Sequence, residues 1–440
     1  MKDELNTSRR RFLRKSLFGA GAIGLRSLAT GLPLSFFVSG FPHKEALAME
    51  EAERPFLILM GSQAGDPFNA NTPGCYGVDG VVNNPQPEMA ATNLRLGDVS
   101  TQAAAPWASL PQWVLDQTHF VHHRTYQNAH PQFSKVLGLV GSAKSVSGGG
   151  TEQIASVYSS ENAQALQTIQ AEPVALTGSL TFEGRVLQSI RPQTLASMFR
   201  TETGTELELE SIRESTLDSL HSLLRDSGTP EQRRWIERYA TSHEQVQQLD
   251  ERFLERFGNI TDNFARGQID AALTLIMMRV SPVMHIEIPF GGDNHSDPGL
   301  MNEKTDTVAA LEVMNHLFQE IDALGLRDKV TVANLNVFGR TLGKLGTEGR
   351  DHNLNHHVMM MSGPRIRPGI SGSIVPNGND FGATAIDSAT GQGHDDADIP
   401  ADETLEAAAK TLATAVGVPA DRVDVRIQRG KVIRAVLEDG

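Results

Sequence analysis

Apolar residues in this chain form short continuous runs that alternate with polar loops and amphipathic segments. Residues 56–60 read Phe-Leu-Ile-Leu-Met and lead into a loop at 61–67 that contains Gly61 and Gly65. A continuous apolar run of this length is typical of a strand buried on both faces. Residues 283–289 alternate in polarity and residues 329–337 form another largely apolar run, so both segments are predicted to be strands.

The segment between the last two strands indicates how they are connected. Residues 305–324 have the spacing of an amphipathic helix, which gives the order strand, helix, strand of a βαβ unit. Ligands of such sheets bind at the carboxyl ends of the strands, so the loops after Met60, Pro289 and Val337 are expected to converge. The predicted fold class is α/β.

Other segments add helices and shorter strands to this prediction. Residues 66–106 are rich in Asn, Pro, Gly and Ala and have little periodicity, which predicts a long surface excursion. The remaining predicted elements are a strand at 118–122, a strongly helical stretch at 206–278, a helix at 401–416 that Gly417 ends, and a short pair of strands at 423–433.

The first 48 residues have the pattern of an export signal. Residues 8–14 read Ser-Arg-Arg-Arg-Phe-Leu-Arg, a largely apolar stretch covers 16–40, and residues 46–48 read Ala-Leu-Ala. We expect a twin-arginine signal peptide at 1–48, cleavage after Ala48 and a periplasmic or extracellular mature protein. The alternative is an uncleaved membrane anchor. No stable membrane span is expected after cleavage, because no stretch of about 20 clean apolar residues remains.

Charge and cysteine content exclude several classes of protein. The 440 residues include 39 Lys and Arg against 53 Asp and Glu, which gives a formal net charge of −14. An acidic chain is not expected to have nucleic acid as its main partner. Cys75 is the only cysteine, so no intramolecular disulfide and no cysteine zinc site are expected.

Histidine and aspartate gather in two of the expected loops. Residues 293–297 follow a predicted strand with the pattern Asp-x-His-x-Asp, and residues 350–357 read Arg-Asp-His-Asn-Leu-Asn-His-His. Neutral imidazole and carboxylate are the ligands preferred by zinc, manganese and iron. The predicted metal ligands are Asp293, His295, Asp351, His352 and His356. Two alternatives remain: an isolated Asp-x-His is common in turns, and neighbouring histidines of an extended segment face opposite sides.

Two further residues are candidates for a catalytic role. His130 precedes Pro131, which favours an extended backbone, and three other histidines occur at 119, 122 and 123. Arg340 follows the strand at 329–337, where a guanidinium suits an oxyanion such as phosphate or sulfate. A structural salt bridge is the alternative for Arg340. No nucleophile-elbow serine, phosphate loop or dinucleotide fingerprint is present, which argues against those enzyme classes.

In the order of these motifs the chain resembles a family of secreted bacterial proteins named domain of unknown function 1501, which is similar to the alkaline phosphatase and sulfatase superfamily. The resemblance implies a three-layer α/β/α sandwich of the alkaline phosphatase type, as a single domain over 49–440 with a helical insertion around 206–278. It implies a metal-binding hydrolase pocket, with Asp293, His295, Asp351 and His352 as candidate ligands. The shared motifs lie at 56–61, 128–131, 291–295, 338–341 and 350–352.

The chain departs from that superfamily at two positions where carboxylates are expected. The loop after the first strand reads Gly-Ser-Gln-Ala-Gly over 61–65, and Asp66 comes later. Before the Phe-Gly of the later strand, Val337 takes the place of an acidic residue. Thr125 and Ser134 are the candidates for a nucleophile near the expected segment.

Two hypotheses of function follow. The first is an exported hydrolase of small-molecule or glycan phosphate or sulfate esters that depends on a divalent ion of zinc, manganese, iron or calcium. The second is an exported protein of the same fold without catalysis, which binds a cell-surface glycan or an envelope protein.

Overall fold

The computed structural model describes residues 54–62, 70–132, 136, 153–183, 185–199, 251–290, 292–343 and 348–438. The predicted signal peptide, residues 206–250 of the predicted helical stretch, and Ser134 lie outside the described residues. Within the described residues, no helix combines the length and the apolar character needed to cross a membrane.

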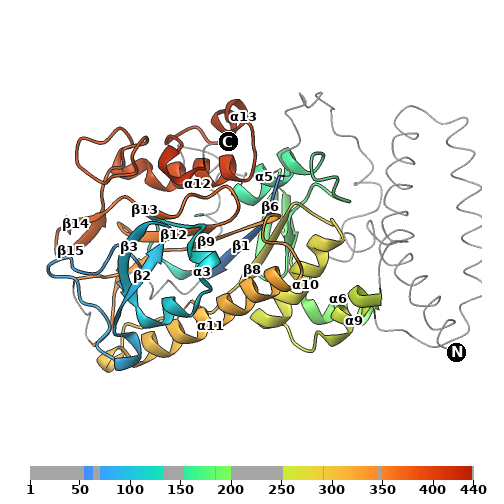
Figure 1. Cartoon of the computed structure of the whole chain (residues 1–440), viewed down its shortest axis with the longest axis horizontal. Helices are drawn as coiled ribbons and strands as arrows, with labels where there is room; N and C mark the ends of the chain where they lie inside the picture. The colour runs from blue at the N-terminus through green and yellow to red at the C-terminus, as the bar shows by residue number, and fades with distance from the viewer. Residues whose placement is uncertain are drawn as a thin grey trace, which may run out of the picture.

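A seven-stranded sheet forms the centre of the molecule (Figure 1), with the strand order β13-β4-β12-β9-β1-β8-β5. Strand β12 runs antiparallel to both of its neighbours, and the other pairs of neighbouring strands are parallel. The α/β class is therefore confirmed, with a mixed sheet. The strands are β1 (Phe56–Ser62), β4 (Thr118–His123), β5 (Val174–Ala175), β8 (Val283–Glu287), β9 (Val330–Asn336), β12 (His357–Ser362) and β13 (Gly369–Ser371).

The predicted βαβ unit is present, with another strand between its two strands. Strands β8 and β9 both pair with β1 in parallel, and α11 (Met301–Ala323) connects them. Strand β1 is buried along its whole length, as its continuous apolar run predicts. Strand β8 alternates in sequence but is buried at its first four residues, because helices cover both faces of the sheet.

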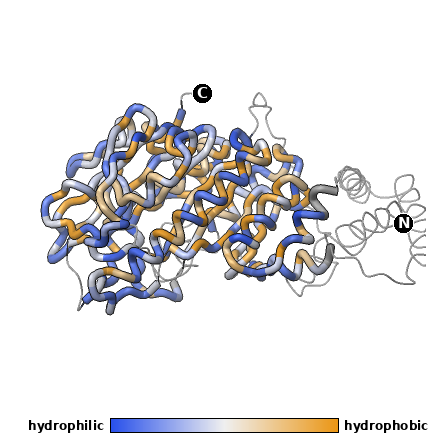
Figure 2. Tube along the Cα trace, turned by 60° about the horizontal axis from the view of Figure 1, so that its bottom comes forward, coloured by the Kyte–Doolittle hydropathy of each residue, from blue (hydrophilic) through white to orange (hydrophobic). Residues whose placement is uncertain are grey.

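Successive residues of β1 point into two separate hydrophobic cores. Ile58 and Met60 pack in a core shared with α10 (Ala265–Met277) and α11. Leu57 and Leu59 pack in a core shared with α5 (Ile154–Asn162) and α12 (Thr404–Ala415). Helices thus cover both faces of the sheet, and hydrophobic stretches lie mainly in the interior (Figure 2). Because α10 packs against β8, this part of the predicted insertion is one of the covering helices.

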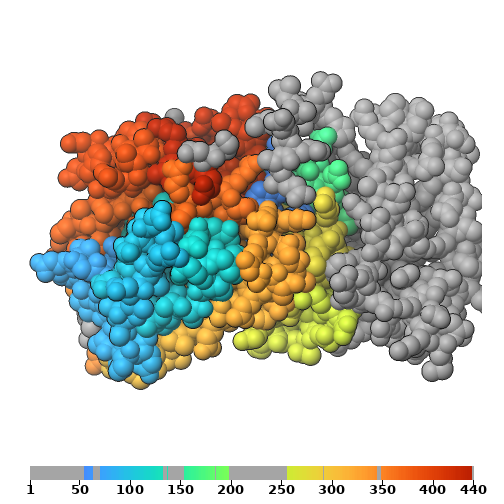
Figure 3. Space-filling view, in the orientation of Figure 1, coloured from blue at the N-terminus to red at the C-terminus, as the bar shows by residue number. Residues whose placement is uncertain are grey.

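The structure adds detail to one prediction of local structure and shows that another is wrong. The predicted excursion at 66–106 contains a hairpin of β2 (Ala91–Leu96) and β3 (Val99–Ala104). In Figure 3 this part of the chain, in cyan, is visible on the surface below the orange and red C-terminal part. The predicted strands at 423–433 are absent from that described segment, which instead contains helix α13 (Ala420–Arg426). Val423 and Ile427, four residues apart, are buried while Val425 is exposed, so the apolar period is helical.

The remaining elements are short. The helices are α3 (Gln112–Leu115), α6 (Pro192–Phe199) and α9 (Glu251–Asn259). The strands are β6 (Ser179–Phe182), β7 (Arg185–Gln188), β10 (Gly339–Arg340), β11 (His352–Asn353), β14 (Ile374–Asn377) and β15 (Asp380–Ala383). The 3-10 helices are η3 (Pro87–Met89), η4 (Ala105–Ser109), η5 (His130–Gln132), η6 (Pro298–Leu300), η7 (Ala401–Glu403) and η8 (Arg434–Val436).

Candidate functional site

Loops from several strands meet at one edge of the sheet. Strands β4, β8 and β9 end at this edge, and β12 begins there because it runs in the opposite direction. The loops after β4 and β8 and the segment before β12 supply the polar side chains that gather at the edge. We call the group of His130, Asp293, His295, Asp351 and His352 the open cluster. The sheet geometry therefore brings together residues that are far apart in sequence.

His295 lies at the centre of the open cluster. Its Nδ1 is 3.0 Å from Asp351 Oδ1 and its Nε2 is 3.2 Å from Asp293 Oδ1. The same Nε2 is 3.0 Å from His352 Nε2. Two carboxylates and one imidazole, from two separate loops, thus lie within hydrogen-bond distance of the His295 ring.

The ring of His352 contacts two other rings, those of His130 and Phe338. His130 Nε2 is 3.5 Å from Asp293 Oδ2, and its ring packs edge-on against that of His352. The Phe338 ring stacks on His352 with the centroids 4.0 Å apart. His352 Nδ1 lies 2.5 Å from the carbonyl oxygen of Asn128 and must donate, since a carbonyl only accepts. The Nε2 of a neutral His352 is then left with its lone pair facing the cluster.

The open cluster is partly accessible to solvent. The side chains of Asp293, Asp351 and His295 are 54%, 46% and 41% exposed. Burial acts to raise the pKa of Asp293, but the charges of Arg340 and His295 lower it below its ordinary value. Burial lowers the pKa of His352, with Arg340 acting in the same direction. These shifts favour an ionised Asp293 and a neutral His352, the protonation states in which the two side chains bind a metal.

Arg340 lies beneath the open cluster in the interior and forms an ion pair with Asp293. Its side chain is fully buried, with Nη1 donating to Asp293 Oδ1 at 3.2 Å and Nη2 donating to the Gly292 carbonyl at 3.1 Å. Nη1 also lies 3.5 Å from the Arg350 carbonyl, so the guanidinium links both loops of the cluster. This geometry matches the salt-bridge alternative from the sequence. Binding of an oxyanion by Arg340 stays a prediction.

A buried ion pair that sequence analysis missed supports the second loop. Arg350 Nε donates to Glu303 Oε2, and Glu303 also accepts from the side chains of Asn71 and Asn84. Glu303 stands in the first turn of α11 among ordinary helical polar residues. No sequence pattern marks it, because its partners come from distant segments.

His356 does not lie in the open cluster. It is fully buried and its Nε2 is 2.9 Å from His122 Nδ1, in a second group that includes Cys75. Its neighbour His357 packs instead against His123, with the ring centroids 5.3 Å apart. The two adjacent histidines therefore point in different directions, as an extended segment requires, but both are buried. Thr125, a candidate nucleophile, is buried and donates to the Gln127 carbonyl.

The donor set of the open cluster fits a divalent metal ion. It combines imidazole nitrogens with carboxylate oxygens, a set that zinc, manganese and iron accept. His130, Asp293 and His352 each place one such atom within 4.8 Å of the other two. The exposure of these side chains leaves room for water or a substrate beside an ion, as catalytic rather than structural metal sites require.

One family model matches the chain, over residues 149–390, which is more than half of its length. That family is described as a protein of unknown function (DUF1501). No curated protein matches the chain.

Proposed function

The chain belongs to the DUF1501 family, and from this membership and the geometry of the open cluster we propose that it is an exported metal-dependent hydrolase of phosphate or sulfate esters. The observation that carries the proposal is the convergence of two carboxylates and three imidazoles at an accessible edge of the sheet. A binuclear or mononuclear hydrolytic centre draws on this donor set. Substrates of this class are small-molecule or glycan esters.

The residues of the open cluster and Arg340 have different roles in the proposed reaction. Asp293, His295, Asp351 and His352 would hold the metal. A bound divalent ion would polarise the ester oxygen and lower the pKa of a bound water. His130, 3.5 Å from Asp293 and 32% exposed, is placed to give a proton to the leaving group. Arg340 is a positioning residue, because its contacts are with Asp293 and backbone carbonyls.

The proposal extends to the fold type and the location of the protein. Helices on both faces of the central sheet, with the site at its carboxyl edge, support an alkaline phosphatase-like sandwich. Residues 8–14 and 46–48 support twin-arginine export to the periplasm or beyond. The net charge of −14 supports partners other than nucleic acid.

Hydrolysis of a chromogenic ester tests this function. The full-length chain is incubated with zinc, manganese, iron or calcium and assayed on p-nitrophenyl phosphate and p-nitrophenyl sulfate. We expect turnover that a chelator abolishes and that Asp351→Asn lowers at least 100-fold. The matched control Asp395→Asn removes an exposed carboxylate from another loop and keeps full activity. Turnover that survives both chelation and Asp351→Asn contradicts the proposal.

A second function is favoured by the ends of the two central strands. Ser62 and Asn336 are register partners at the carboxyl ends of β1 and β9, and both are buried. Neither carries the carboxylate that the superfamily resemblance leads one to expect near this edge. We propose as the alternative a protein of the same fold that binds an envelope protein or glycan without hydrolysis. Recovery of one partner from envelope extract, equally with and without chelator, would support it.

A further inference from the structure

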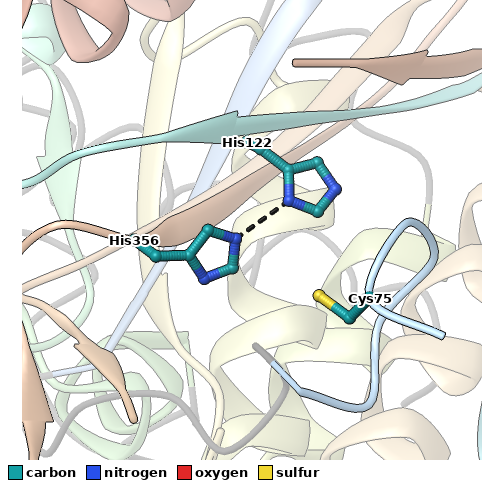
Figure 4. A group of neighbouring side chains, drawn as sticks. All are labelled: Cys75, His122 and His356. Atoms are coloured by element: carbon teal, nitrogen blue, oxygen red, sulfur yellow. Dashed lines mark hydrogen bonds between the residues drawn. The ribbon is translucent and has the colours of Figure 1, made fainter. Parts of the chain in front are cut away.

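A second group of metal-ligating side chains lies in the interior, apart from the open cluster. Cys75, His122 and His356 are all fully buried and come from three separate segments: the turn before residue 76, strand β4, and the loop before β12. One potential ligand atom from each lies within 4.8 Å of the other two. Figure 4 shows the two imidazole rings facing each other and the Cys75 sulfur pointing toward them. We call these three residues the closed cluster.

Hydrogen bonds determine where the protons of the closed cluster lie. His122 Nε2 is 3.2 Å from the Pro73 carbonyl and must donate to it, because the carbonyl only accepts. Burial lowers the pKa of His122 to about 4, so the ring is neutral at pH 7 and its Nδ1 carries a lone pair. His356 Nε2 then donates to that Nδ1 at 2.9 Å. A backbone-anchored imidazole with its other nitrogen aimed inward is the usual arrangement of a metal-ligating histidine.

The second nitrogen of His356 supports a ligand role. His356 Nδ1 is buried and has no hydrogen-bond partner among the described residues. When Nε2 binds an ion it must give up its proton, and the vacant Nδ1 can take that proton within the same ring. The ring therefore changes from proton donor to metal ligand without adding a charge to the interior.

We propose that Cys75, His122 and His356 bind one copper(I) ion, at a site separate from the open cluster. Thiolate and imidazole are soft to borderline ligands, and thiolate selects copper(I) and zinc over magnesium, calcium and manganese. The closed cluster offers three protein ligands, whereas structural zinc sites almost always have four. The number of ligands therefore favours copper(I) over zinc.

Charge balance in the interior favours copper(I) over a divalent ion. Burial raises the pKa of the Cys75 thiol to about 12, so the metal-free side chain is neutral. A copper(I) ion with one thiolate and two neutral imidazoles has no net charge, whereas zinc with the same ligands has a charge of about +1. Since an unpaired buried charge is costly, the monovalent ion is the better match.

The binding step is balanced by the release of one proton. The Cys75 S–H bond breaks and its proton leaves for solvent, while a copper–sulfur bond and two copper–nitrogen bonds form. In a trigonal site of three ligands, two imidazole nitrogens that are each about 2.0–2.1 Å from the ion lie about 3.5–3.6 Å apart. The present separation of 2.9 Å between His122 Nδ1 and His356 Nε2 must therefore widen by roughly 0.6–0.7 Å when the ion binds.

Gly74 allows the turn that carries Cys75 to approach His122. Its φ of +90° suits glycine, and a Cβ there would lie 2.4 Å from His122 Nε2. All three described side chains of the closed cluster are fully buried, which fits an ion that is stored or stabilises the fold rather than one that activates water.

Copper(I) titration against a chromogenic chelator tests this site. The probes are copper(I) and zinc alone, added without oxygen to the full-length chain and to three variants. Cys75→Ser removes the thiolate with little change in volume, Asp293→Asn with Asp351→Asn removes the carboxylates of the open cluster, and Asp395→Asn is the surface control. We expect one equivalent of copper(I) in every chain except Cys75→Ser, whose affinity falls at least 100-fold.

X-ray absorption at the copper edge is measured on the unmutated chain, so the result does not depend on whether a variant folds. We expect one sulfur and two nitrogen neighbours in the copper-loaded, unmutated chain. Equal copper(I) binding by Cys75→Ser, absence of a sulfur neighbour, or preference for zinc over copper(I) in the competition would overturn the proposal. Because the open-cluster double variant keeps this copper, failure here is distinguishable from failure of the hydrolase function.

Discussion

Arg350 and Glu303 form an ion pair in which neither side chain is more than 1% exposed, with Nε and Oε2 2.5 Å apart. Arg350 also donates to the carbonyls of Thr341 and Val82, so its guanidinium joins three segments of the chain. Asp351 and His352 follow it directly in sequence. The ion pair therefore fixes the position of the second site loop against the start of α11.

Glu303→Gln should destabilise the protein strongly. The amide keeps the shape of the side chain but leaves the Arg350 charge buried without its counter-ion, which costs about 3–5 kcal/mol in comparable pairs. Urea unfolding followed by circular dichroism measures the change in the free energy of unfolding. Glu312→Gln, on the exposed side of the same helix, is the matched control and should change it by less than about 0.5 kcal/mol. Equal effects of the two variants would show that the ion pair contributes little.

Gly349→Ala should separate the two loops of the open cluster. A Cβ at residue 349 would lie 1.8 Å from the Asn294 carbonyl oxygen, which also accepts a hydrogen bond from the Arg350 amide. We expect weaker metal binding together with destabilisation of about 1–3 kcal/mol from overpacking. Isothermal titration with zinc and urea unfolding report the two effects. Gly258→Ala, in helix α9 with open space around the added methyl, should leave metal binding unchanged and stabilise slightly.

Arg340→Lys should weaken metal binding while leaving the charge in place. A lysine cannot donate to both Asp293 and the Gly292 carbonyl in the geometry of a guanidinium. Loss of such a supporting contact typically lowers metal affinity about 10–100-fold. The control is Arg327→Lys, since Arg327 pairs with Asp322 on the surface. If Arg340→Lys raises the KM for a phosphate ester and keeps metal affinity, Arg340 binds substrate instead.

Part of the open cluster was predictable, because His130, Asp293 and His295 come after predicted strands. The order strand, loop, helix, strand places Asp293 and the loop containing Arg340 at one sheet edge before any coordinates are known. Strand β12 was not predicted, and its antiparallel direction could not have been read from the sequence of one strand alone. That direction brings Asp351 and His352 to the same edge.

The closed cluster and the Glu303–Arg350 pair could not be predicted from the sequence. The partners of Cys75 in the closed cluster, His122 and His356, lie more than 40 positions away in sequence, so the sequence did not connect the thiol with them. The sequence analysis excluded a zinc site made of several cysteines, but it did not consider a site in which one cysteine is combined with histidines. His356 was predicted to be a ligand together with Asp351 and His352 because all three belong to the run of Asp and His at 350–357, but the rings of His352 and His356 lie in different clusters.

Stability should fall in acid between pH 6.5 and pH 4. Burial lowers the pKa of His119, His122 and His285 to about 4 and that of His123 to about 3, from an ordinary value of 6.5. The unfolded chain therefore binds more protons in this window, and each histidine removes up to about 1.4 kcal/mol per pH unit. Burial raises the pKa of Glu406 to about 7, which acts in the opposite direction; burial also raises the pKa of Asp270, Asp306 and Asp380, but by less.

Thermal unfolding at a series of pH values measures this dependence. The melting temperature should be highest above pH 6.5 and decrease steadily toward pH 4. His394→Gln, which changes an exposed histidine, should follow the same curve as the unmutated chain. A melting temperature that is constant or rises from pH 6.5 to pH 4 would contradict burial of these histidines in neutral form.

The most direct test of the open cluster is elemental analysis of the purified full-length chain beside the double variant Asp351→Asn with His352→Ala. Asp395→Asn serves as the control for loss of an aspartate elsewhere. A second preparation of each chain with Cys75→Ser excludes metal held at the closed cluster. We predict at least one equivalent of zinc, manganese, iron or calcium in the chains with an intact open cluster and less than a tenth of that in the double variant. Equal metal content in the double variant and the control, or none in any folded chain after incubation with these ions, would contradict the assignment.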